Sequence, residues 1–174
     1  ADFDLKNHEK NSGQNLKYRD PETGEEFLPH VIEPTFGLDR SVLATLLEAY
    51  HEDGERVVLK LPSKLAPYKA AVFPLLKNKP ELVELAKKIY NDLRKDIMVA
   101  WDDRGNIGKR YFSQDEIGTV VSITCDFQSL EDDTVTLRDR DTMGQIRVEI
   151  LKLREIIDRI IAGEEFLSFG KIVK

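Results

Sequence analysis

Short apolar runs alternate with helix-like segments through the second half of the chain, and this alternation leaves few folds open. Residues 70–76 form an apolar run typical of a buried strand, and residues 97–101 form another. Between them, Pro80 opens a segment whose apolar residues recur at helical spacing: Leu82, Leu85, Ala86, Ile89 and Leu93. A strand, a helix and a strand in this order predict a crossover unit, in which the two strands pair in parallel.

The segments that follow continue the pattern. Residues 108–117 predict a short polar helix, and residues 119–127 form a strongly β-prone run. Residues 134–138 and 145–150 are expected to pair as antiparallel strands, and residues 151–162 predict a closing amphipathic helix. The fold class predicted for this half of the chain is therefore α/β, a mixed β-sheet flanked by helices.

The amino-terminal segment is different in character. The chain opens without an initiator Met, and we expect it to be an excised part of a longer protein. Residues 6–24 are polar and contain turn-forming pairs, which predict a loop or hairpin with little core of its own. Residues 27–33 predict a short buried strand, and Gly37 introduces a segment with apolar residues at helical spacing.

Two domains are expected. Pro and Gly interrupt the sequence repeatedly between residues 51 and 67, and these breakers predict no regular structure there. We therefore place residues 1–60 in a first domain and residues 61–174 in a second, with residues 61–68 as the linker at its start.

Composition limits the functions that this chain can have. Its net charge is −6, and no apolar stretch approaches the roughly 20 residues needed to cross a bilayer, so we expect a soluble, cytoplasmic protein. Nonspecific nucleic-acid binding needs many Lys and Arg near phosphates, so any RNA contact of this acidic chain must be local. Cys125 stands alone in a β-prone run and the His residues are scattered, so no disulfide, nucleophile or metal site is indicated.

Residues 32–40, Ile-Glu-Pro-Thr-Phe-Gly-Leu-Asp-Arg, place a carboxylate, a hydroxyl and a guanidinium around a glycine turn at a helix start. Glu33 suits a substrate ammonium group, Gly37 lets backbone amides approach closely, and Arg40 suits a phosphate or stacking on adenine. The alternative is structural: a strand end, a turn at Pro34, and charged residues on the first turn of a surface helix. The spacing alone leaves both interpretations open.

The second informative stretch runs from residue 101 to residue 118. Lys109 and Arg110 are suited to binding phosphates, and Tyr111 or Trp101 to stacking on a splayed base. Asp115 or Glu116 can accept a hydrogen bond from the exocyclic amine of cytosine. Single-stranded RNA loops are recognised by such combinations. The alternative is again structural, because a Trp that ends an apolar strand often belongs to the core and Lys-Arg pairs are often only solvated.

Several segments, in collinear order, carry a resemblance to one enzyme family. Residues 27–40 are similar to the third class II signature as it occurs in glycyl-tRNA synthetases. Residues 105–111, Gly-Asn-Ile-Gly-Lys-Arg-Tyr, resemble a segment of the anticodon-binding domains of these enzymes, and residues 134–143 resemble their next strand. Residues 60–67 match their linker, so the resemblance covers nearly the entire chain.

The resemblance implies site residues at the matching positions. Glycine binding is implied for Glu33, Pro34, Thr35, Phe36 and Gly37. ATP binding is implied for Gly37, Leu38, Asp39 and Arg40. Anticodon binding is implied for Trp101, Lys109, Arg110, Tyr111, Asp115, Glu116 and Arg138. The family usually has Ser where this chain has Thr35, and no catalytic residue or metal ligand is assigned here.

The resemblance also implies the fold and activity of the parent protein. It predicts a class IIa anticodon-binding domain, preceded by a remnant of the antiparallel class II catalytic domain, in an enzyme that uses ATP and Mg²⁺ to attach glycine to tRNA(Gly). The parent is expected to be a homodimer. The chain alone, without the first two class II signatures, is expected to be inactive and to hold no cofactor. Two alternatives are a non-catalytic synthetase-like paralogue acting as a nucleic-acid-binding accessory subunit, and a flavodoxin-like protein-interaction module.

Overall fold

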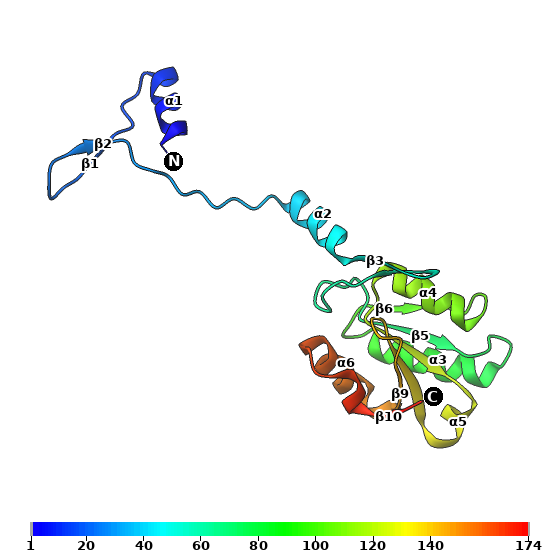
Figure 1. Cartoon of the computed structure of the whole chain (residues 1–174). Coiled ribbons are helices and arrows are strands. Elements are labelled where there is room, and N and C mark those ends of the chain that lie inside the picture. Colours follow the sequence, from blue (N-terminus) through cyan, green and yellow to red (C-terminus); the bar gives the residue numbers. More distant parts are fainter. Residues whose placement is uncertain (1, 174) are drawn as a thin grey trace. The chain divides into compact units, whose positions relative to one another are not determined.

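The computed structural model describes residues 2–173 of the chain. The chain divides into two compact units, Ala1–Ser41 and Val42–Lys174. Figure 1 shows the helices and strands of each unit in sequence order. Within the described residues, no helix combines the length and the apolar character that crossing a bilayer requires.

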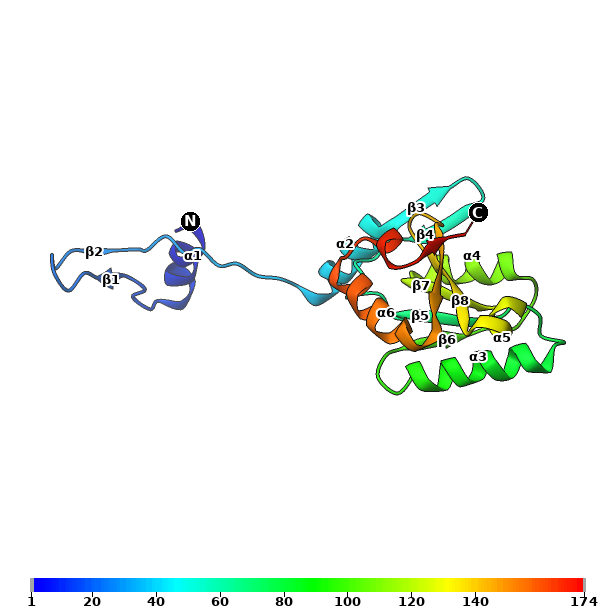
Figure 2. The ribbon, with the colours of Figure 1, turned by 90° about the horizontal axis from the view of Figure 1, so that it is seen from below.

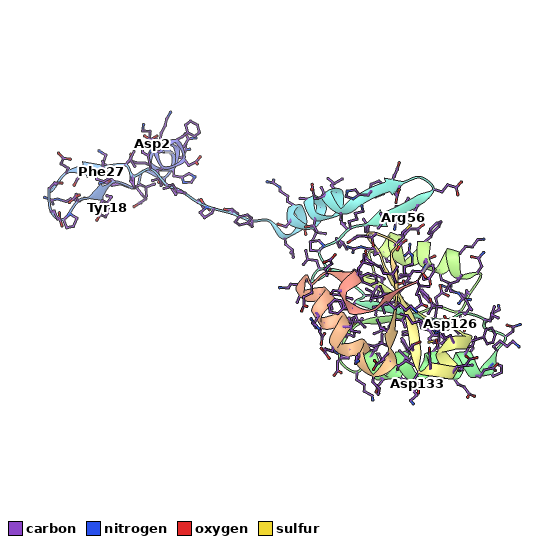
Figure 3. The ribbon with its side chains drawn as sticks, turned by 60° about the horizontal axis from the view of Figure 1, so that its bottom comes forward. Asp2, Tyr18, Phe27, Arg56, Asp126 and Asp133 are labelled. Carbon is purple, nitrogen blue, oxygen red and sulfur yellow. The ribbon has the colours of Figure 1, made fainter. Side chains whose placement is uncertain are left out.

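The first unit contains one helix and a short hairpin. Helix α1 (Phe3–Ser12) is followed by strands β1 (Tyr18–Arg19) and β2 (Glu26–Phe27), which pair in antiparallel fashion. The rings of Tyr18 and Phe27, labelled in Figure 3, meet edge to face with their centroids 5.8 Å apart. The prediction of a loop or hairpin over residues 6–24 therefore misses the helix, and it includes β1 and most of the turn of the hairpin but not β2.

The buried strand predicted over residues 27–33 is wrong. Strand β2 ends at Phe27, and residues 28–37 have no regular structure. Pro29 and Pro34 have no N–H to donate to a neighbouring strand, which disfavours an extension of β2. Residues 30–37 are exposed, so the apolar side chains that suggested burial are not part of a core. The helix predicted after Gly37 is present as α2 (Leu38–Ala49).

A hairpin occupies part of the segment in which breakers predict no regular structure. Strands β3 (Tyr50–Asp53) and β4 (Arg56–Leu59) pair around a turn that contains Gly54, so the prediction is wrong there. An Asp-Gly pair between two strands is a hairpin signal rather than a breaker. The hairpin belongs to the second compact unit, and the predicted boundary after residue 60, as a division between parts of a synthetase, stays a prediction.

The second unit is built on a six-stranded mixed sheet, which confirms the predicted fold class. Its strands, in the order in which they lie side by side, are β10 (Lys171–Ile172), β9 (Gln145–Glu149), β8 (Thr134–Asp139), β7 (Val121–Cys125), β5 (Ala70–Pro74) and β6 (Val99–Trp101). Strand β5 pairs in parallel with β6 and with β7, and the other neighbours are antiparallel. The predicted crossover unit and the predicted antiparallel pair are both present.

Helices cover both faces of this sheet. Helix α3 (Pro80–Leu93) joins β5 to β6 on one side, and α4 (Ile107–Ile117) joins β6 to β7 across β5. Right-handed crossovers that run in opposite directions place their helices on opposite faces, and Figure 2 shows α3 and α4 with the sheet between them. The remaining elements are α5 (Phe127–Asp132), η1 (Ile150–Lys152), α6 (Leu153–Ala162) and η2 (Phe166–Phe169).

The main core lies between the sheet and helices α3 and α6. Strand residues such as Val72, Ile123 and Leu137 are completely buried there, together with Ile157 of α6. The residues that alternate with them on β7 and β8 face α4 and are polar but buried: Ser122, Thr124, Thr136 and Arg138. Buried polar groups need partners within the protein. Thr124 and Arg138 find theirs on α4, in Tyr111 and Asp115, whereas Thr136 is bonded to Asp126 and Arg147.

Candidate nucleic-acid interface

The connections that leave the parallel strands meet at one edge of the sheet. Residues 75–79 follow β5, residues 102–106 follow β6, and Asp126 follows β7. Figures 1 and 2 both show these connections on the same side of the second unit. The strand order reverses at β5, which has β6 on one side and β7 on the other. In open α/β sheets, ligands bind at the carboxyl edge next to such a reversal.

Arg110 of α4 holds two of these connections together. The residue is only 2% exposed, and its guanidinium donates four hydrogen bonds to main-chain carbonyls. Nη1 donates to the carbonyl of Pro74 at 2.6 Å. The other three bonds reach the carbonyls of residues 103, 104 and 105, at 3.3, 3.0 and 3.0 Å. These bonds stabilise the loop after β6 against the end of β5.

A buried ion-pair network lies at the other end of α4. Asp115 is 1% exposed and accepts two hydrogen bonds from Arg138 of β8, at 2.9 and 3.0 Å, and one from Arg56 of β4, at 3.2 Å. Arg56 also donates to the carbonyl of Arg140 at 2.7 Å and to Asp53 at 2.8 Å. Arg56, labelled in Figure 3, therefore ties the hairpin of β3 and β4 to helix α4.

Tyr111 connects α4 to the sheet beside this network. Its hydroxyl lies 2.7 Å from the hydroxyl of Thr124, its ring meets Phe73 edge to face, and the Arg138 guanidinium lies 4.7 Å from the ring centroid. Burial raises the pKa of the Tyr111 phenol, so the hydroxyl stays protonated at neutral pH. The inner face of α4 is thus engaged in contacts within the protein.

The outward face of α4 presents a different set of side chains. Lys109 in the first turn and Glu116 in the last turn are exposed, as are Phe112 and Ser113 between them. Two helical turns separate Lys109 from Glu116, which corresponds to roughly 10 Å along the helix axis. This face offers a cation near the carboxyl edge and a carboxylate towards the opposite end.

The structure divides the residues predicted to bind the anticodon into two groups. Lys109 and Glu116 are exposed, and their contacts with RNA stay predictions. The polar groups of Arg110, Asp115 and Arg138 are bonded inside the protein, so direct contacts with a phosphate, a cytosine amine or a base do not fit this structure. Burial explains the difference, because a buried charge is stable only when the protein supplies its partners.

The two aromatic residues predicted to stack on a base are also engaged. Trp101 packs edge to face against Tyr90 of α3, with the ring centroids 5.8 Å apart. It therefore lies on the core side of the sheet and not beside α4. Tyr111 is half-buried between Phe73 and Arg138, and neither ring stands free for a base in this structure.

Sequence reasoning missed several arginines that hold this region together. Arg140, which is 4% exposed, donates to the carbonyls of Gly118 and Leu61, both at 2.9 Å. Arg56 reaches Asp115 from the hairpin. Residues so far apart in the chain meet only through tertiary contacts between the hairpin, the helix and the sheet, and no local pattern in the sequence marks them as partners.

A second missed ion pair lies at the carboxyl edge. Arg147 of β9 donates to both carboxylate oxygens of Asp126, at 2.6 and 2.8 Å, and Figure 3 labels Asp126. Burial raises the pKa of Asp126, but the bonds from Arg147 and from the Ser129 N–H outweigh it, and the net shift is downward. The carboxylate therefore stays ionised and paired at neutral pH.

Residues 33–40, which are predicted to bind glycine and ATP, are all exposed. Residues 33–37 have no regular structure, and α2 begins at Leu38, directly after Gly37. The structure thus places Gly37 at a helix start, as the sequence predicts. The binding roles of Glu33 to Arg40 stay predictions.

Cys125 is a buried thiol at the end of β7, and we expect it to be unreactive in the folded chain. Burial and the neighbouring charge of Asp126 raise the pKa of the thiol to about 12, and only the thiolate is a nucleophile. The protonated thiol therefore stabilises the folded state fully below its unfolded pKa of about 8.5, and this contribution is lost as the pH rises towards the folded value.

Ellman's reagent should label Cys125 at about pH 8 only after denaturation in guanidinium chloride. Rapid labelling without denaturant would contradict the prediction.

Known proteins resemble this chain over most of its length. Residues 69–160 match the family described as the anticodon binding domain. Glycine–tRNA ligase from Caldanaerobacter subterraneus subsp. tengcongensis is 52% identical over 173 residues, which are 97% of this chain and 36% of that protein. Glycine–tRNA ligase from Bacillus cereus is 48% identical over 165 residues, which are 92% of this chain and 35% of that protein. The chain thus spans about a third of the length of these curated relatives.

A solved structure supports the fold independently. Prolyl-tRNA synthetase from Cryptosporidium parvum, complexed with L-proline and AMP, has a TM-score of 0.56 and 24% sequence identity, covering 64% of this chain and 24% of that chain. At this identity the likeness concerns the fold alone. The match over residues 69–160 covers the strands of the carboxyl edge and all of α4. The chain therefore belongs to the anticodon-binding domain family, and its curated relatives are glycine–tRNA ligases.

Proposed function

We propose that this chain supplies the tRNA anticodon-reading domain of a glycine–tRNA ligase, the enzyme that attaches glycine to tRNA(Gly) at the expense of ATP. The observation that carries the proposal is the family match over residues 69–160, which includes α4 and the loops at the carboxyl edge. The exposed face of α4 supports it, because Lys109 suits a phosphate and Glu116 suits the exocyclic amine of cytosine.

We assign different roles to the exposed and the buried residues of this region. In the proposal, Lys109 and Glu116 meet RNA directly, whereas Arg110, Asp115 and Arg138 hold α4 and its loop in position. Support of this kind reduces the ordering cost on binding, because the contact residues stand on an element that is already fixed.

The first test is binding of this chain to a glycine-type anticodon stem-loop and to a stem-loop in which the two cytosines are replaced. We expect preference for the unaltered stem-loop. Glu116→Gln should weaken its binding roughly tenfold and change binding of the altered stem-loop much less, because one good base contact contributes about 1–3 kcal/mol. Fluorescence anisotropy with labelled stem-loops measures both.

The matched control is Glu131→Gln, which removes the same charge from an exposed position on α5. It should leave both affinities unchanged. Equal losses for both stem-loops with Glu116→Gln would remove Glu116 from base reading. Failure of the unmodified chain to bind either stem-loop would overturn the proposed function and would favour the accessory-subunit alternative.

We further propose that residues 33–40 contribute to the glycine and ATP sites of the complete enzyme. The exposed Arg40 guanidinium fits a phosphate and the exposed Glu33 carboxylate fits an ammonium group. Among residues 2–173, no three His, Cys, Asp or Glu side chains are arranged to hold a metal ion. The Mg²⁺ that accompanies ATP in the complete enzyme is part of the same proposal. The homodimeric state and cytoplasmic location of the parent are part of the same proposal.

A further inference from the structure

We propose that the loops after β5 and β6 form one binding surface for the phosphates of the tRNA anticodon loop. The surface consists of Lys77 and Lys79 from the first loop, Arg104 from the second loop, and Lys109 from the start of α4, and is called the basic edge below. The inference rests on the proposed function and deepens it, because it adds cations from a loop that the sequence motifs do not include.

The cations of the basic edge are accessible. Lys77, Lys79 and Lys109 are exposed, and the side chain of Arg104 is 88% exposed. One nitrogen of Arg104, Nε, donates to Asp102 at 3.1 Å, which orients the guanidinium and leaves its far side in solvent. An exposed Lys or Arg is available to form an ion pair with an anionic ligand such as a phosphate group.

Two acidic groups near the basic edge, Asp102 and Asp126, are already paired, whereas Asp103 in the second loop and Glu81 at the start of α3 form no ion pair among the described residues. Asp102 accepts from both the backbone N–H and the side chain of Arg104, at 2.9 and 3.1 Å, and these bonds help to lower the pKa of Asp102 against the effect of its burial. Asp126 is held by Arg147. Lys77, Lys79 and Lys109 form no ion pair among the described residues, and in a chain with a net charge of −6 this grouping of cations is not a general property of the surface.

The two loops are also held in one arrangement. Arg110 bonds the carbonyl of Pro74, which precedes the first loop, and three carbonyls of the second loop. The strands that lead into the loops are hydrogen-bonded neighbours about 4.8 Å apart, and β5 continues to Pro74, two residues past the position that pairs with Trp101 at the end of β6. The cations therefore stand on a scaffold that requires little ordering when RNA binds, and ordering of flexible loops is a main cost of association.

A matched pair of double variants tests the basic edge in this chain. Lys77→Gln with Lys79→Gln removes two cations from the edge, and Lys87→Gln with Lys88→Gln removes two exposed cations from the outer surface of α3. Both double variants change the net charge equally. Binding of the glycine-type stem-loop is measured at several salt concentrations, together with circular dichroism to confirm folding.

The edge variant should bind roughly tenfold more weakly at low salt, and the slope of log affinity against log salt should fall by about 0.7 for each lost phosphate contact. The control variant should keep both values. The edge variant should lose the same factor of affinity for both stem-loops, because phosphate contacts do not depend on the base sequence. Arg104→Gln should add to the loss.

Equal effects of the two double variants would overturn the basic edge and leave the proposed function intact, since only net charge would then matter. A loss of affinity confined to the stem-loop with both cytosines would also overturn the basic edge, because Lys77 and Lys79 would then recognise bases and not phosphates. If the unmodified chain binds neither stem-loop, the proposed function fails and the basic edge fails with it.

Discussion

Asp115→Asn should lower the free energy of unfolding by about 3–5 kcal/mol, because removing one partner of a buried ion pair leaves the other charges without compensation. Asp115 lies between two buried arginines, Arg138 at 2.9 and 3.0 Å and Arg56 at 3.2 Å. The amide keeps the shape of the carboxylate, but it carries no charge and presents N–H donors where a second acceptor is needed. Denaturation in urea, followed by circular dichroism, measures the loss.

Two comparisons make this result specific to the network. Asp92→Asn removes an exposed carboxylate whose pair with Lys95 is open to solvent, and it should not change stability measurably. Arg56→Met should cost less than Asp115→Asn, because Asp115 keeps both bonds from Arg138. The Arg56→Met substitution also removes the Arg56 Nε, which has no hydrogen-bond partner among the described residues. If Asp115→Asn is as mild as Asp92→Asn, the network does not hold α4 in place.

Gly118→Ala should destabilise the chain by roughly 2–5 kcal/mol, for two independent reasons. Gly118 ends α4 in a left-handed conformation, with φ 78°, which costs a residue with a side chain about 1–2 kcal/mol. A Cβ there would also lie 2.9 Å from the Leu59 carbonyl and 3.0 Å from a Leu61 methyl group, and such overpacking costs about 1–3 kcal/mol.

Gly163→Ala separates these two causes. Gly163 ends α6 with φ 99°, but a Cβ there meets no atom within 4 Å. It should show only the conformational cost, measured by the same urea denaturation. Equal effects at the two glycines would mean that the hairpin does not press on the end of α4. The excess at Gly118 therefore measures the contact between β4 and α4.

The elements of the second unit could be predicted where their signals are local. The apolar face of α3, its opening Pro80 and the apolar runs on either side all lie within a short stretch, and the predicted parallel pairing is present. The strand predicted at residues 27–33 is absent because a strand also needs a neighbouring strand to pair with, and two prolines disfavour such pairing there. The breakers at residues 51–67 predict no hairpin at β3 and β4, because an Asp-Gly pair either interrupts a regular element or forms a hairpin turn, and the pairing of the two strands decides between them.

In the candidate site, too, the local sequence does not determine which side chains are available to a partner. The residue types at 109–116 suggested RNA contacts, and two exposed residues, Lys109 and Glu116, remain suited to them. Arg110, Asp115 and Arg138 have the same chemistry in sequence, yet their bonds lie inside the protein. Charge and hydrogen-bonding capacity are properties of a residue type, whereas availability to a partner depends on what surrounds it.

The order β5, α3, β6, α4, β7, β8, β9 and α6, and the family to which the chain belongs, follow from its amino-acid sequence alone, because hydrophobic spacing and motifs act over a few neighbouring residues. The division of the charged residues between buried and exposed follows from tertiary contacts. Strand register and two opposed crossovers bring Arg56, Asp115 and Arg138 together from a hairpin, a helix and a sheet. A charge so buried must be paired within the protein, and only charges left at the surface are available to RNA.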